Sequence, residues 1–216
     1  MLSKEQYIHT FLDLYKKYGF KSISVNDLAL HTGVSKKTIY KYFYSRDEII
    51  RSVVRQLVSD LNKTLHESVD ERADAISNII NLVTSMVKNL SKINPVFFYT
   101  LQKLNLNVED LFDELRNEYK KNLQRFINNG IEEGVFRENM DKEYLLLSHE
   151  NIISLLITNP TENFNHATYD TKRFVYGLID NIRGFTTVKG HKLIDKRLEL
   201  VEKIFQKEGI PSSFDN

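Results

Sequence analysis

Cysteine is absent from this 216-residue chain, and helix-breaking residues are scarce, with three prolines and eight glycines. Without cysteine the chain can form no disulfide, no thiolate metal site and no cysteine nucleophile. Proline and glycine are the poorest helix formers, so their scarcity favours an all-helical fold. A chain of this length accommodates one large domain or two modest ones with a substantial core.

Long apolar runs are also missing, since no stretch approaches the roughly 18 consecutive apolar residues that span a bilayer. The first residues, MLSKEQYIHTFLDLYKK, place Lys4 and Glu5 before apolar residues at helical spacing. They lack the unbroken apolar stretch of a signal peptide. We therefore expect a mature cytoplasmic protein with no membrane partner.

Familiar catalytic patterns do not occur either. The sequence has no phosphate-binding loop, nucleophile elbow or His-Glu-x-x-His motif, and its six histidines are scattered singly. His149 stands beside Glu150, but neighbouring residues on a helix diverge by about 100° and no second histidine follows at i+4. We expect no enzyme, no metal site and no cofactor.

Charge is unevenly distributed along the chain, although the net charge is only +1. Residues 1–50 hold eight basic and five acidic residues, whereas the remainder holds 22 basic and 24 acidic ones. A positive N-terminal part on a slightly negative body indicates a phosphate-binding surface. The alternative is chance clustering of solvated charges, which is how we interpret Lys16, Lys17 and Lys21.

Apolar residues recur at helical spacing along the whole chain. The first part predicts helices over 3–18 (ending at Gly19), over 25–31 (capped by Ser24) and from Ser35 to about Phe43. Further helices are predicted over 46–68, 72–92, 95–104, 108–133, 141–158, 168–188 and 190–207, with the last break at Lys189-Gly190. The predicted fold is all-α, with a three-helix domain at 1–46 joined by a continuous helix to a larger helical domain at 47–216.

The most informative pattern is a helix-turn-helix within residues 24–50. This motif needs a small residue where two helices cross, a glycine in the turn and an apolar residue after it, and Ala29, Gly33 and Val34 meet these needs. On the next helix Ile39 and Phe43 are four residues apart and face the core. The polar positions left for a DNA groove and its backbone are Lys36, Lys37, Thr38, Tyr40, Lys41 and Tyr42. Lysines neutralise phosphates by counterion release, and hydroxyls bond to phosphate oxygens or base edges.

The same residues resemble a known family. The run Leu-Ala-x-x-x-Gly-Val-Ser-x-x-Thr-Ile-Tyr-x-Tyr-Phe-x-Ser-Arg-Asp-Glu-Ile at residues 28–49 is similar to the N-terminal signature of TetR-family (TetR/AcrR-type) transcriptional regulators. A first helix that ends in Tyr18-Gly19-Phe20 precedes it, as in that family. Residues 130–141 resemble the family's turn between the seventh and eighth helices, and residues 183–190 resemble the end of the ninth.

The resemblance implies two sets of DNA contacts. Contacts to the DNA backbone fall on Ser24, Ser35, Lys37, Tyr40, Tyr42 and Arg46, and base-edge candidates are Lys36, Lys37, Thr38 and Lys41. Lys37 is a departure, because the family often has glycine there and approaches DNA closely. Arg46 replaces the commoner lysine, keeps its charge and can bind a phosphate bidentately.

The resemblance also implies a small-molecule pocket in the body and a dimer formed by the last two long helices. Pocket candidates are Phe97, Phe98, Tyr99, Tyr119, Phe126, Tyr144 and His149, although any single such aromatic residue is more often core than ligand wall. Segments 144–157 and 168–188 are apolar around much of their circumference. Dimer candidates are Ile152, Leu155, Leu156, Phe174, Leu178, Ile182 and Phe185. The alternative is that both helices are buried within one monomer.

We therefore predict a sequence-specific regulator that binds a pseudo-palindromic, double-stranded DNA operator as a homodimer. Repression relieved by an unknown small-molecule effector is the predicted mode. An activator or architectural protein without a ligand is the alternative. A second alternative is a helical interaction protein with a degenerate helix-turn-helix. Such a protein would have lost the lysines and hydroxyls of residues 35–42, which are intact here.

Overall fold

The computed structural model describes residues 2–104, 106–158 and 171–207, and within these ranges the chain is helical. The helices are α1 (Lys4–Ser22), α2 (Val25–His31), α3 (Lys36–Ile39), α4 (Arg46–Glu67), α5 (Ala75–Ser91), α6 (Val96–Gln102), α7 (Glu109–Glu132), α8 (Lys142–Thr158), α9 (Thr171–Arg183) and α10 (Val188–Lys207). The same ranges hold no strand beyond an isolated antiparallel bridge between Phe136 and Thr186. The predicted all-α class is confirmed. In the part of the chain described, no helix is both long and apolar enough to cross a membrane.

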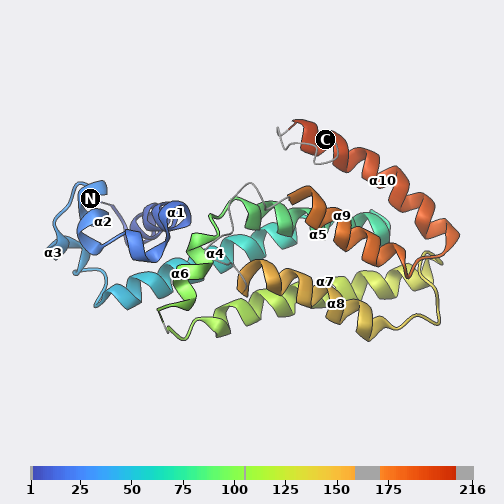
Figure 1. Cartoon of the computed structure of the whole chain (residues 1–216), viewed down its shortest axis with the longest axis horizontal. Coiled ribbons are helices and arrows are strands. Elements are labelled where there is room, and N and C mark those ends of the chain that lie inside the picture. Colours follow the sequence, from blue (N-terminus) through green and yellow to red (C-terminus); the bar gives the residue numbers. More distant parts are fainter. Residues whose placement is uncertain (1, 105, 159–170, 208–216) are drawn as a thin grey trace.

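The molecule is elongated, with α1–α3 gathered at one end (Figure 1). We call residues 4–45, which contain these helices, the head, and α4–α10 the body. Helix α4 leads directly from the head into the body (Figure 1). At the opposite end the turn after α7 meets the turn after α9, where the Thr187 N–H donates to the Val135 carbonyl at 2.9 Å.

Serine residues start each of the first four helices. Their side chains accept hydrogen bonds from backbone N–H groups three residues later, and these serines are Ser3, Ser24, Ser35 and Ser45. Such caps satisfy backbone donors that the helix itself leaves unpaired, and each contributes about 1 kcal/mol. The helix starts predicted at Ser24 and Ser35 are confirmed, and they position the head's short helices.

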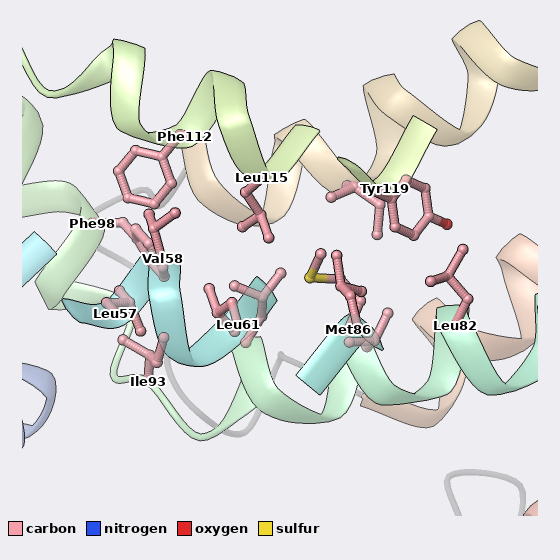
Figure 2. Close-up of a cluster of buried hydrophobic side chains, with 14 of the residues drawn as sticks. Leu57, Val58, Leu61, Leu82, Met86, Ile93, Phe98, Phe112, Leu115 and Tyr119 are labelled. Atoms are coloured by element: carbon pink, nitrogen blue, oxygen red, sulfur yellow. The ribbon is translucent and has the colours of Figure 1, made fainter. Parts of the chain in front are cut away.

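The body is held together by the apolar faces of α4, α5 and α7. Figure 2 shows Leu57 and Leu61 of α4 beneath Phe112 and Leu115 of α7, with Met86 of α5 beside Leu61, all of them buried. Burial of each such side chain contributes roughly 1.5–3 kcal/mol. Since α4 follows the head directly, this core fixes the helix to which the head is attached.

Several predicted boundaries differ from the structure, and three of them are informative. Gly19, with φ 74°, interrupts α1 as expected, but a further turn follows to Ser22. Helix α3 ends at Ile39, and the residues up to Phe43 continue as irregular turns. The break predicted at Lys189-Gly190 is wrong, because α10 already begins at Val188. Gly190 lies inside that helix, where a Cβ would collide with the Val135 carbonyl oxygen.

Candidate nucleic-acid interface

The turn of the helix-turn-helix is closed by backbone hydrogen bonds. The Val34 N–H donates to the Ala29 carbonyl at 3.0 Å, and the Gly33 N–H donates to the Leu30 carbonyl at 3.2 Å. Gly33 has φ 66°, a conformation that glycine adopts without strain. Ala29 is buried where α2 meets α3. The three positions on which the motif was predicted therefore have the expected roles in the structure.

Two buried side chains fix α3 and the following turns to the rest of the head. Ile39 and Phe43 are both buried, and the Phe43 ring centroid lies 6.0 Å from that of Phe11 in α1. The expected inward orientation of this pair is confirmed. The opposite side of α3 is solvent-exposed and carries Lys36 and Lys37.

The remaining polar residues of this region lie in the same part of the head. Tyr40 is 40% exposed, and the Lys36 ammonium lies 5.9 Å from its ring centroid. Lys41 is exposed, and the Thr38 and Ser35 hydroxyls lie 2.9 Å apart. Tyr42 is only partly accessible.

Tyr42 faces the head as well as the solvent. Its ring centroid lies 5.3 Å from that of Tyr7, so part of the side chain is packed and its hydroxyl has limited reach. The predicted backbone contact by Tyr42 stays a prediction.

Ser24 is exposed, but both of its donors are engaged by Asp27. The Ser24 hydroxyl donates to the Asp27 carboxylate at 2.6 Å and the Ser24 N–H donates to it at 2.8 Å. These two bonds hold the pKa of Asp27 below its ordinary value, so the carboxylate stays charged. A phosphate contact by Ser24, as expected from the sequence, requires its hydroxyl to leave Asp27.

Arg46 anchors the end of α1 rather than standing free at the surface. Its guanidinium donates to the Phe20 carbonyl, and its Nε is buried without a partner among the described residues. Burial raises the pKa of the nearby Tyr15 hydroxyl to about 12, and the charge of Arg46 opposes that rise. The predicted phosphate contact by Arg46 stays a prediction, and the structure adds a packing role.

A contact that the sequence did not reveal joins the start of the head to the first turn of α4. The Lys4 ammonium lies 3.0 Å from the Glu48 carboxylate and 4.9 Å from the Phe43 ring centroid. The Glu48 carboxylate also accepts the Tyr44 N–H at 2.6 Å. These bonds hold the pKa of Glu48 below its ordinary value. No local pattern in the sequence pairs Glu48 with Lys4, which lies 44 residues away.

The head is docked on α6 through the last turn of α1. The Phe20 N–H donates to the Thr100 hydroxyl at 2.9 Å in a buried setting, and the Phe20 and Phe97 ring centroids lie 4.6 Å apart. The Asn94 N–H donates to the Lys16 carbonyl at 3.0 Å. The end of α1 is therefore bound to the body by both polar and aromatic contacts.

A cavity of about 600 Å³ opens on the body side of α6. Its lining comes from α6, α7, the segment between them and α8, and consists of Phe98, Leu101, Gln102, Leu106, Asn107, Val108, Glu109, Phe112, Arg116 and Ser154. The wall is apolar at Phe98 and Phe112, with the charged groups of Glu109 and Arg116 beside it. The cavity is large enough for a drug-sized molecule.

The seven predicted pocket residues are not brought together. Phe98 lines the cavity, whereas Phe97 packs between Phe20 and Phe98. Tyr144 is 58% exposed and lines a different groove between α7 and α8. Phe126 is buried, and Tyr99 is partly buried beside Lys103. The aromatic residues of one segment face different sides because adjacent helix positions diverge.

Tyr119 and His149 form a buried pair between α7 and α8. The Tyr119 hydroxyl and His149 Nδ1 lie 3.2 Å apart. Burial lowers the pKa of His149 to about 4 and raises that of Tyr119, so both are neutral near pH 7. In the part of the chain described, no group of three or more potential ligand side chains is placed to hold a metal ion.

The predicted dimer residues divide into three groups. Leu178 and Ile182 are buried within the chain's own core, so their assignment to an interface is corrected: the apolar face of α9 packs against α5. Ile152, Phe174 and Phe185 are partly exposed. The side chains of Leu155 and Leu156 lie outside the described residues. Tyr144 and Leu147 of α8 are exposed apolar residues. From the sequence, Tyr144 was predicted to line the pocket, and Leu147 was among neither the pocket nor the dimer candidates.

An exposed cationic helix, presented by a helix-turn-helix on a larger helical body, defines a DNA-binding regulatory protein. Residues 10–53 match the family model described as bacterial regulatory proteins, tetR family. Residues 10–53 therefore carry the N-terminal DNA-binding domain typical of that family of transcriptional regulators.

Solved structures show that the fold of the body is shared as well. A transcriptional regulator from Saccharomonospora viridis in complex with choline aligns with a TM-score of 0.70 at 20% identity, over 85% of this chain and 97% of that one. A TetR transcription regulator from Haloarcula marismortui aligns with a TM-score of 0.67 at 17% identity, over 85% of this chain and 98% of that one. The transcriptional regulator FadR from Bacillus subtilis, in complex with stearoyl-CoA, aligns with a TM-score of 0.61 at 19% identity, over 82% of this chain and 96% of that one. No curated protein sequence matches the chain.

Proposed function

We propose that the protein is a transcriptional repressor whose dimer binds a pseudo-palindromic operator and is released by a small molecule bound in the body. The observation that carries the DNA-binding part is the exposed lysine-bearing side of α3, fixed to the head by the buried Ile39 and Phe43. Because this packing fixes the orientation of α3, Lys36, Lys37 and Thr38 can present their polar groups to base edges in one orientation.

The cavity beside α6 supports the small-molecule part. Two neighbours in fold were solved with choline and with stearoyl-CoA, which shows that those proteins hold small molecules. In this chain α6 contributes Phe98 and Leu101 to the cavity, while its Thr100 binds the end of α1. A ligand that displaces α6 would therefore pull on α1, which packs against α4 in turn, and would alter the spacing of the two heads.

The exposed apolar residues of α8 support a dimer. Tyr144 and Leu147 are three residues apart, so they share one face of α8, and both are more than half exposed. The Tyr144 ring centroid lies 6.1 Å from that of the partly exposed Phe185. Pairing of this face between two copies would remove apolar surface from water and present two heads to the two halves of an operator.

The test is DNA binding by full-length protein, measured by fluorescence anisotropy. The operator is first selected from a random library of DNA duplexes by the protein itself. Lys37→Ala and Tyr40→Ala are expected to weaken binding to the selected duplex by about tenfold each. Lys37→Ala is also expected to reduce the salt dependence by about one counterion.

Lys121→Ala, an 80% exposed lysine in the body, is the control and should bind like the wild type. Binding that is independent of sequence and insensitive to salt would contradict the proposal, as would unchanged affinity in both head variants. For the ligand, compounds that raise the melting temperature should also release the duplex.

A further inference from the structure

Tyr44 presents an almost fully exposed aromatic side chain on a held backbone. It is 97% exposed. Its N–H donates to the Glu48 carboxylate at 2.6 Å, and the next residue, Ser45, caps α4 by accepting the Glu48 N–H at 3.1 Å. Because the backbone is fixed on both sides, the side chain is presented in a narrow range of positions. A side chain so exposed contributes little to folding and is available to contact a partner.

The charge around Tyr44 selects the class of partner. From Leu28 to Arg46 the chain contains four basic residues and no acidic one. The Glu48 carboxylate, which accepts the Tyr44 N–H, is paired with the Lys4 ammonium at 3.0 Å. The positive charge around this loop therefore favours a polyanionic partner over a neutral or cationic protein surface.

The place of Tyr44 in the motif determines which part of the polyanion it meets. Base edges are contacted from the beginning of a recognition helix, here Lys36 to Thr38. Tyr44 follows the end of that helix, where the chain leaves the groove and turns into α4. A phenol at that point reaches the sugar–phosphate backbone, to which tyrosine hydroxyls donate hydrogen bonds.

We propose that Tyr44 is an additional DNA-backbone contact, whose hydroxyl donates to a phosphate oxygen beside the base pairs read by α3. The contact rests on the proposed DNA-binding function and adds a residue outside the predicted contact set. Because the phenol is neutral, it releases no counterion and strengthens binding without changing the salt dependence.

The experiment measures affinity of full-length protein for the selected duplex and for a scrambled duplex, across salt concentrations. Tyr44→Ala is expected to weaken binding to both by about five- to tenfold, and Tyr44→Phe by about threefold, with the slope against salt unchanged. Melting temperatures of both variants should equal that of the wild type. Tyr18→Ala, at a 43% exposed tyrosine of α1 outside the acid-free segment, is the matched control and should bind normally.

The outcomes separate this contact from the function on which it rests. If the wild type selects no DNA, the proposed function fails. If the wild type binds while Tyr44→Ala binds equally well, the contact alone is overturned, and Tyr44 serves a protein partner instead. A Tyr44→Ala loss accompanied by a lower melting temperature would likewise overturn it, in favour of a structural role.

Discussion

Two glycines of the head share a backbone conformation but differ in their surroundings. Gly19 has φ 74° and Gly33 has φ 66°. A Cβ on Gly19 would lie 3.0 Å from both the Thr100 hydroxyl and the Val96 carbonyl oxygen, whereas a Cβ on Gly33 would meet nothing within 4 Å. Gly33 is therefore required only for its conformation, while Gly19 is also required for close approach to α6.

Gly19→Ala is expected to lower the free energy of unfolding by about 2–4 kcal/mol, because strain and collision add. Gly33→Ala, the control, should lower it by about 1–2 kcal/mol through strain alone. Urea denaturation of both variants measures the difference. Equal losses would show that the contact of Gly19 with α6 is unimportant.

Glu48 makes the head sensitive to acid. The Tyr44 N–H and the Lys4 ammonium hold its pKa below the ordinary value of 4.5. Its contribution to stability is therefore complete above about pH 4.5 and is lost as the pH falls through the lowered folded-state pKa. Thermal unfolding between pH 7 and pH 3 should show a smaller acid-induced decrease in Glu48→Gln than in the wild type. Parallel curves for the two proteins would exclude this role of Glu48.

Local patterns predicted the backbone frame of the site better than the state of its side chains. Ser35, Gly33 and Ile39 have the predicted roles because capping, turn conformation and helix periodicity depend on neighbours in sequence. Arg46 was expected to be available to phosphate, yet its guanidinium binds the Phe20 carbonyl. That partner is 26 residues away, and no short-range pattern identifies it.

At the scale of elements, α6 is the helix that connects the head with the cavity. It is short, from Val96 to Gln102, and is packed on α1 through Thr100 and Phe97. On its other side, Phe98, Leu101 and Gln102 line the cavity. A short helix with few internal hydrogen bonds depends on its neighbours for stability, so its position responds to changes on either side.

Thr100→Val is expected to leave the Phe20 N–H buried without an acceptor and to lower the free energy of unfolding by about 1–3 kcal/mol. Hydrogen exchange at the Phe20 amide should become faster, while exchange in α7 should be unaffected. Thr64→Val is the control, because the Thr64 hydroxyl donates only to the Asp60 carbonyl of its own helix. Unaltered exchange at Phe20 would contradict a coupling role for Thr100.

At the scale of the whole molecule, assembly determines whether the head can act. A single helix-turn-helix has a small footprint, and two heads at a fixed spacing are needed to read both halves of a palindrome. On the proposed function, the exposed face of α8 with Tyr144 and Leu147 supplies the pairing surface. The buried Leu178 and Ile182 instead stabilise each protomer.

Leu147→Glu is expected to shift the protein from dimer to monomer in sedimentation velocity experiments, because burial of an unpaired carboxylate opposes pairing. Operator affinity should fall by at least tenfold with it. Leu200→Glu, at a 41% exposed leucine of α10, is the control and should remain dimeric. A wild type that sediments as a monomer while binding the operator tightly would contradict the dimer.

The sequence by itself determined the all-α class, the helix-turn-helix and the inward orientation of Ile39 and Phe43, because these depend on capping, turn residues and helical periodicity within a few positions. Only the tertiary structure decided which distant groups meet. The Lys4–Glu48 pair is 44 residues apart and the Phe20–Thr100 hydrogen bond spans 80. It also decided that α9 turns its apolar face inward and that the aromatic residues of the body separate, since burial depends on which helices pack together and not on the composition of any one helix.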